Sequence, residues 1–180
     1  MAISPCALVV ARRTTERLHA FGLGALAVNS AWVSRLTVVL AGVWAGILVC
    51  IGTLAAPAAF AVLASVDAGR VVARILLVEA YLSLAIACVL FAIERTRSHR
   101  AAAAGMGSVF NTNLVLLLGT LFCTVAGHFA VQPMMAAARI GQGPWSFGAL
   151  HAVAGGLFAL KGLLVLALAW RLGKSSVGAR

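Results

Sequence analysis

The sequence has 180 residues, of which 63% are hydrophobic and 10% are charged, and its mean hydropathy is +1.06. Soluble domains carry about 25% charged residues, so this composition excludes an ordinary soluble enzyme or binding domain. The formal net charge of +10 does not indicate a nucleic-acid partner, because most of the cations flank apolar segments.

Four apolar stretches are each long enough to cross a membrane. A helix spans the hydrocarbon of a bilayer with about 20 mainly apolar residues. We therefore predict an all-α fold, an integral membrane four-helix bundle. The four predicted spans cover residues 36–60, 71–93, 112–135 and 148–170.

The spans divide the chain into three parts. Residues 1–35 form a basic leader, 36–171 the membrane domain and 172–180 a short basic tail. Charged and apolar residues alternate in the leader, which favours a helix lying in the membrane interface. Gly22 and Gly24 weaken such a helix, so a leader without fixed structure is the alternative.

The distribution of Lys and Arg predicts the orientation. Cations concentrate on the side of the bundle that holds both ends of the chain and the loop between the second and third spans, and few lie on the other side. Cytoplasmic loops carry this excess, so we expect both termini in the cytoplasm. We also expect a multi-pass protein of the bacterial inner (cytoplasmic) membrane, whose first partner is the lipid bilayer. The cations on the crowded side are Arg12, Arg13, Arg17, Arg35, Arg95, Arg97, Arg100, Arg171, Lys174 and Arg180, against Arg70, Arg74 and Arg139.

The first span has small or polar residues at every third or fourth position: Gly42, Gly46, Cys50, Thr53 and Pro57. Gly42 and Gly46 form a GxxxG step, which lets membrane helices approach closely, within the bundle or between copies of the chain. Pro57 has no backbone N–H, so the carbonyl of Thr53 loses its helical partner and must find another inside the protein. We therefore predict that this face is turned into the bundle.

The third span carries Thr120, Thr124, His128 and Gln132 at four-residue intervals, which places them on one helix face. One interpretation is hydrogen bonding to neighbouring helices. The other is a water-filled, polar-lined pocket that binds a small solute, because a histidine inside a span is uncommon and often functional.

Two ionisable residues lie deep in the second and fourth spans, Glu79 and Lys161. Charges in apolar surroundings pair or lose their charge. We predict a buried ion pair between them, which is either a structural link between the two helices or part of an ion or proton pathway.

His128 and His151 lie towards the same side of the membrane, close to Met134 and Met135. Two His and two Met suit copper, and two His on facing helices suit haem. No spacing motif supports either group, so we predict no metal or other cofactor and ordinary hydrogen bonds for both histidines. No nucleophile-and-base pair or phosphate-binding loop is recognisable, so we expect no enzyme.

Several short motifs of the chain contain Pro57, Phe60, Gly69, Pro133, Phe147 and His151. Together these motifs resemble the transmembrane protein 205-like family, over residues 36–171. The resemblance implies a four-helix membrane domain and supplies no activity. That family often has the polar residues Ser and Asn where this chain has the apolar residues Ala154 and Phe158.

Three classes of function follow from these features. The first is a membrane bundle of unassigned role that binds or helps move a small solute. The second is an accessory subunit of a larger membrane complex, and the third is a haem or copper redox protein that uses His128 and His151.

Overall fold

The structure is a computed structural model that describes residues 32–105, 108 and 110–177. The chain divides into two units, Met1–Thr37 and Val38–Arg180. Residues 32–37 of the first unit are helical, and the rest of the predicted leader lies outside the described residues. All packing discussed below belongs to the second unit.

The described residues form four helices that are long and apolar enough to cross a membrane, and they contain no strand. The predicted all-α class and number of spans are confirmed, and the protein is a multi-pass membrane protein. The four membrane helices are longer than the apolar stretches, because helical structure continues into the polar flanks. They cover Trp32–Val62, Ser65–Ala103, Thr112–Arg139 and Phe147–Ser175.

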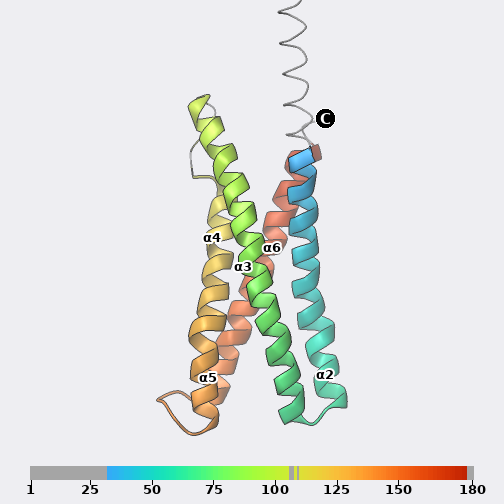
Figure 1. The fold of residues 1–180 in the computed structure, drawn as a ribbon, viewed down its shortest axis with the longest axis vertical. Coiled ribbons are helices and arrows are strands. Elements are labelled where there is room, and N and C mark those ends of the chain that lie inside the picture. The colour runs from blue at the N-terminus through green and yellow to red at the C-terminus, as the bar shows by residue number, and fades with distance from the viewer. Residues whose placement is uncertain (1–31, 106–107, 109, 178–180) are drawn as a thin grey trace, which may run out of the picture. The chain divides into compact units, whose positions relative to one another are not determined.

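Two of the four membrane helices contain a π-helical segment, so the structure has more elements than spans (Figure 1). Residues 32–50 are α-helical and continue without a break into the first π-helix. The labelled elements are η1 (Ile51–Ala55), α2 (Ala56–Val62), α3 (Ser65–Ala103), α4 (Thr112–Thr124), η2 (Val125–Val131), α5 (Gln132–Arg139) and α6 (Phe147–Val177).

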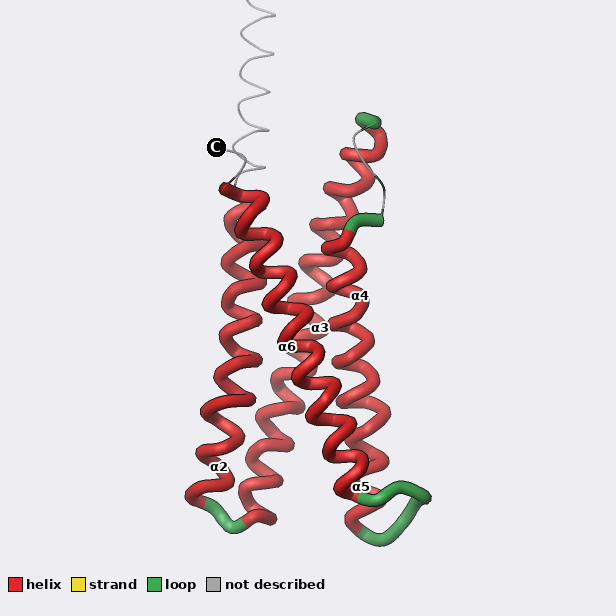
Figure 2. The backbone as a smooth tube through the Cα atoms, turned by 180° about the vertical axis from the view of Figure 1, so that it is seen from behind, coloured by secondary structure: helices red, strands yellow, loops and turns green. Residues whose placement is uncertain are grey.

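The turn between α2 and α3 and the loop at residues 140–146 lie at the same end of the bundle (Figure 2). We call this the far end, and the opposite end, where α6 finishes, the C-terminal end. The far-end loop begins with a Schellman motif, in which Gln142 N–H donates to Ala137 O and Gly141 N–H donates to Ala138 O. Gly141 supplies the positive φ of 73° that this motif requires. The motif fixes the end of α5 at Arg139.

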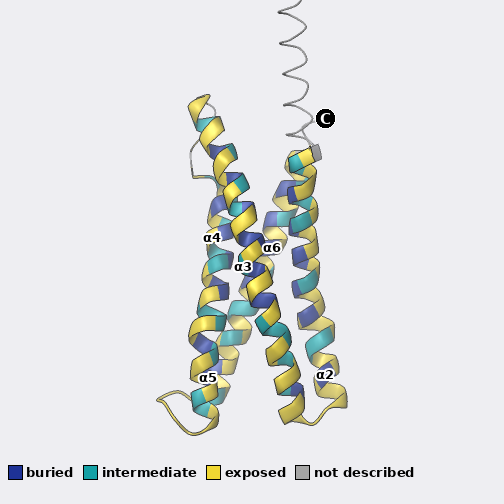
Figure 3. Cartoon of the chain, viewed as in Figure 1, coloured by how far each residue is buried: buried dark blue, intermediate teal, exposed yellow. Residues whose placement is uncertain are grey.

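The main core joins all four membrane helices in the half of the bundle nearer the C-terminal end. Its largest fully buried side chains are Trp44, Leu48, Leu90, Leu117 and Leu168. The buried positions of each helix face its neighbours, whereas most outward positions are exposed apolar residues that suit contact with lipid (Figure 3).

The prediction that the first span turns its Gly42 and Gly46 face into the bundle is wrong. Gly42 and Gly46 are exposed, and a Cβ atom built on either meets no other atom within 4 Å. Trp44 and Leu48 face the bundle instead. Large side chains make more dispersion contacts than glycine, and the buried indole N–H of Trp44 has a hydrogen-bond acceptor there, Ser83.

Each proline of the membrane helices follows a π-helical segment. Ala56 N–H bonds to Ile51 O, five residues back, and this wider turn places Pro57 at the start of α2. Pro133 starts α5 in the same way, after η2. Proline at the first helical positions does not need its missing N–H, so the π-turns accommodate both prolines within continuous membrane helices.

The core predicts a contrast between two leucines of α6. Leu168 is 0% exposed and Leu166 is 45% exposed. We expect Leu168→Ala to lower the free energy of unfolding by about 2–5 kcal/mol, because it leaves a cavity in packed surroundings. Leu166→Ala removes the same atoms from a more exposed position and should change stability far less. Thermal unfolding in detergent measures both, and equal losses would contradict the described core.

Candidate functional site

A cavity of about 770 Å³ lies in the far half of the bundle, and all four membrane helices contribute to its wall. Along α6 it extends from Phe147 to Lys161. At a rise of 1.5 Å per residue, the fourteen steps from Phe147 to Lys161 span about 21 Å, so the cavity is long. Its volume is within the range of about 300–1,000 Å³ that is usual for small-molecule sites.

The cavity exists because two pairs of helices separate towards the far end. α2 packs on α3, and α5 packs on α6. In Figures 1 and 2 these two pairs lie on opposite sides of the far end, and the cavity-lining residues come from both. The main core closes the bundle towards the C-terminal end.

Glu79 and Lys161 lie at the inner end of the cavity, and the structure brings them together. Lys161 Nζ is 2.7 Å from Glu79 Oε2 and 2.9 Å from Oε1, with both side chains buried. Ser83 Oγ donates to Glu79 Oε1, and Trp44 Nε1 donates to Ser83 Oγ at 2.8 Å. This network connects the first, second and fourth membrane helices. Every buried side-chain N or O atom in the described residues has a partner, so the pair is fully compensated.

Phe158 supports this pair. Lys161 Nζ lies 5.3 Å from the centre of its ring, a cation–π distance. The ring also lies against Gly52, where an added Cβ would be 3.4 Å from Cε1. A glycine in η1 therefore leaves room for Phe158 at the cavity wall.

Of the four polar residues spaced four apart in the third span, one is buried outside the cavity and three line it. Thr120 is buried outside the cavity, and its hydroxyl donates to Leu117 O at 2.7 Å. Thr124 lines the cavity but donates to Thr120 O at 2.8 Å. Both hydroxyl protons are thus used within their own helix, and the predicted hydrogen bonds to neighbouring helices are not made by these donors.

The other two of these polar residues are His128 and Gln132. Both line the cavity, and both are half-buried. The His128 ring packs edge-on against Phe129 and Tyr81, with centroids 5.0 Å and 6.3 Å away. Within the described part of the chain, neither the imidazole nor the Gln132 amide has a hydrogen-bond partner. Their polar atoms are available to water or a ligand.

Arg139, Phe147 and His151 lie at the far end of the cavity. The Arg139 guanidinium carbon is 4.8 Å from the centre of the Phe147 ring, and the His151 ring stacks on Phe147 at 5.8 Å. Gly69 lies beside this group, because a Cβ there would be 3.7 Å from Arg139 Nη2. The far end thus joins a cation, an aromatic ring and an imidazole.

The other family-motif residues have separate places. Phe60 lines the cavity with Gly69, Phe147 and His151. Pro57 and Pro133 are instead at the starts of α2 and α5. His128 and His151 both line the cavity, but no group of three or more His, Cys, Asp or Glu residues with metal-binding geometry occurs among the described residues.

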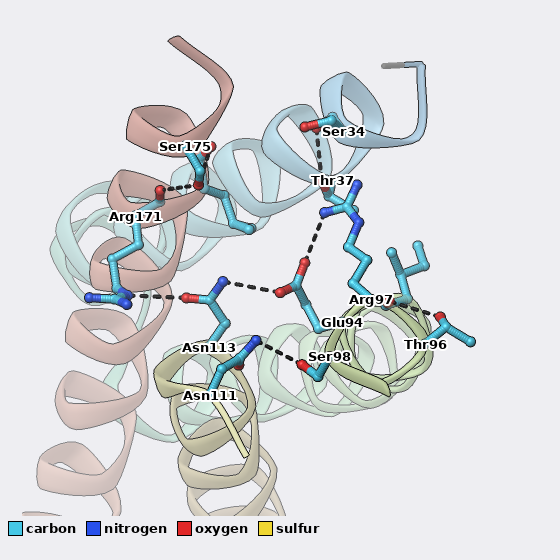
Figure 4. Close-up of polar contacts among 12 residues, drawn as sticks. Ser34, Thr37, Glu94, Thr96, Arg97, Ser98, Asn111, Asn113, Arg171 and Ser175 are labelled. Atoms are coloured by element: carbon cyan, nitrogen blue, oxygen red, sulfur yellow. Dashed lines mark hydrogen bonds and ion pairs between the residues drawn. The ribbon is translucent and has the colours of Figure 1, made fainter. Parts of the chain in front are cut away.

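A second polar network, absent from the sequence prediction, lies at the C-terminal end (Figure 4). Buried Glu94 accepts from Arg97 Nη1 at 2.9 Å and from Asn113 Nδ2 at 3.1 Å. Asn113 Oδ1 accepts from Arg171 Nε at 3.1 Å, so the network connects α3, α4 and α6. Nearby, Asn111 Nδ2 donates to Ser98 Oγ at 2.9 Å.

A sequence signal for this network existed. Glu79, Ser83, Ala87, Leu90, Glu94 and Ser98 recur at three- or four-residue intervals on α3, and all are buried. Extending the face of Glu79 along the helix would have identified Glu94 as buried.

A double-mutant cycle tests whether Glu79 and Lys161 are energetically coupled. Lys161→Met should lower the free energy of unfolding by about 3–5 kcal/mol, because it leaves buried Glu79 without its partner. Glu79→Gln should also destabilise the bundle. The double variant Glu79→Gln with Lys161→Met should be more stable than Lys161→Met alone, because no unpaired charge is then buried. Thermal unfolding in detergent measures the cycle, and additive losses would mean that the two residues are not coupled.

Residues 39–143 match the model of a family described as Domain of unknown function (DUF4149), a range that includes most of the first membrane helix, the whole of the second and third, and part of the far-end loop. Neither the curated proteins nor the solved structures contain a significant match to this chain.

Proposed function

The chain belongs to the family described as Domain of unknown function (DUF4149), and we propose that its membrane bundle binds a small solute in the far-end cavity, or helps to move it. The observation that carries this proposal is the cavity itself. It is lined from every membrane helix, and it contains the unpartnered polar groups of His128 and Gln132.

Chemistry as well as volume supports a binding role. Small-molecule sites are mostly apolar and carry a few convergent polar groups that orient the ligand. This cavity has that composition, with Phe60, Leu76 and Phe158 among its apolar residues and His128, Gln132 and His151 among its polar ones.

The predicted orientation of the chain indicates on which side of the membrane the cavity lies. We propose from the charge distribution that both termini are in the cytoplasm. The Ala-, Gly-, Val- and Arg-rich composition supports the bacterial inner membrane as the location. The cavity then lies in the outer half of the bilayer, and its solute comes from outside the cell or from the outer leaflet. Because Phe60, Gly69, Phe147 and His151 all line the cavity, we also propose that the transmembrane protein 205-like resemblance reflects a shared binding site.

The second candidate is an accessory subunit of a larger membrane complex. The exposed face of the first span favours it, since Gly42 and Gly46 leave open space where another helix, from a different subunit or a second copy, can pack closely.

Native mass spectrometry of the protein, gently extracted from its own membrane, separates the candidates. The solute-binding proposal predicts a single chain or simple homo-oligomer that carries a small bound molecule. Foreign subunits would favour the accessory role instead. Added mass equal to haem or copper would contradict both candidates and favour a redox protein.

Adjacent glycines of α6 provide a matched test of the cavity. Gly155 lines it and Gly156 does not, and a Cβ on either meets no atom within 4 Å. Gly155→Leu should fill part of the cavity and reduce the fraction of protein that carries the small molecule in native mass spectra. Gly156→Leu should leave that fraction unchanged. Equal effects of the two substitutions would count against binding in this cavity.

A further inference from the structure

The charges that line the cavity do not cancel. Three charged residues lie in its wall, Glu79, Lys161 and Arg139. Glu79 and Lys161 neutralise each other through two hydrogen bonds. Arg139 forms no ion pair with any carboxylate of the described residues. The cavity therefore has one uncompensated positive charge, at its far end.

Arg139 is held in a geometry that suits an anion. The Schellman motif fixes the end of α5, and the guanidinium lies over the Phe147 ring. The Arg139 guanidinium donates no hydrogen bond to another described residue, so its N–H groups are available. These donors bind carboxylate or phosphate oxygens in pairs, and such charge-assisted bonds are stronger than neutral ones.

The wall between Arg139 and the ion pair is mainly apolar. It includes Val72, Ala73, Leu76, Met135, Ala154 and Phe158. This surface continues for about 21 Å, at 1.5 Å per residue along α6. A compact polar solute would leave most of it without contacts, whereas an elongated apolar molecule would cover it.

The inner end of the cavity is unsuitable for the anionic group. Lys161 is buried and already donates to both oxygens of Glu79. An anion bound there would displace the Glu79 carboxylate and leave it buried without a partner, which is strongly unfavourable.

We propose that the ligand is an elongated apolar molecule with a single anionic group, which Arg139 binds at the far end while the apolar body extends towards the Glu79–Lys161 pair. This inference rests on the proposed function and specifies its ligand class. Two sources share this chemistry, an anionic membrane lipid and a free long-chain carboxylate.

The test uses the full chain in nanodiscs of neutral phosphatidylcholine. The two ligands are dansyl-labelled undecanoate and its methyl ester, which differ in charge, and the fluorescence of empty nanodiscs is subtracted. We expect the carboxylate to bind about tenfold more tightly than the ester, since a charge-assisted hydrogen bond accounts for a difference of that order.

Variants of Arg139 test whether this residue causes the preference for the carboxylate over the ester. Arg139→Gln should make the affinities of the carboxylate and the ester equal without weakening the ester, and Arg139→Lys should retain part of the preference. Arg74→Gln is the matched control, because Arg74 is exposed near the far end of α3 but does not line the cavity. It should bind both ligands as the wild type does.

The outcomes separate this inference from the proposed function. Binding of both ligands with equal affinity would overturn the anionic preference and leave the cavity as a binding site. Equal losses of preference in Arg74→Gln and Arg139→Gln would also overturn it, because general surface charge would then explain the effect. Failure of both ligands to bind, together with no effect of Gly155→Leu on the native mass spectrum, would overturn both proposals.

Competition identifies the source of the ligand. Displacement of the fluorescent carboxylate by phosphatidylglycerol added to the nanodiscs supports a lipid ligand. Displacement only by unlabelled long-chain carboxylate supports a free acid.

Discussion

The buried ion pair between Glu79 and Lys161 sets the arrangement of the membrane helices. A single charge at the centre of a membrane helix costs about 3 kcal/mol or more, so neither residue is tolerated without the other. Their two hydrogen bonds fix the depth and rotation of α3 relative to α6. Ser83 and Trp44 extend the same constraint to the first span. The indole of Trp44 must face this network, which turns Gly42 and Gly46 outward.

The position of this network divides the bundle into two halves with different packing. Between it and the C-terminal end, large side chains such as Leu90, Leu117 and Leu168 fill the space between the helices. The Glu94 network adds a second polar connection among α3, α4 and α6 there. Beyond the pair, towards the far end, the two π-helical segments and their prolines accompany the separation of α2–α3 from α5–α6. Polar connections between the described helices therefore concentrate where the bundle is closed, and the cavity extends from the Glu79–Lys161 pair towards the far end.

The spans and the partners of the ion pair are predictable from the sequence, because both follow from the high cost of polar groups in hydrocarbon. The shared helix face of His128 and Gln132 is predictable from their four-residue spacing. The sequence does not decide between two favourable alternatives that compete. Either face of the first span can pack, and the choice of the Trp44 face depends on an acceptor, Ser83, in another helix. Glu94 was missed because it is adjacent to the basic cluster of the second loop, where a carboxylate normally faces water. The cavity depends on how far helices separate, which no single helix encodes.

The same division limits what the described conformation can do with a solute. A ligand in the cavity would meet the Glu79–Lys161 pair and, beyond it, the closely packed core, so the cavity is closed towards the C-terminal end. Passage to the C-terminal end would require the ion pair to separate and the large core side chains to move apart. Each unpaired charge would then be exposed to hydrocarbon or need water. Movement across the bilayer by this fold therefore has to be coupled to a change in the charge or the partner of Glu79 and Lys161, whereas binding requires no such change.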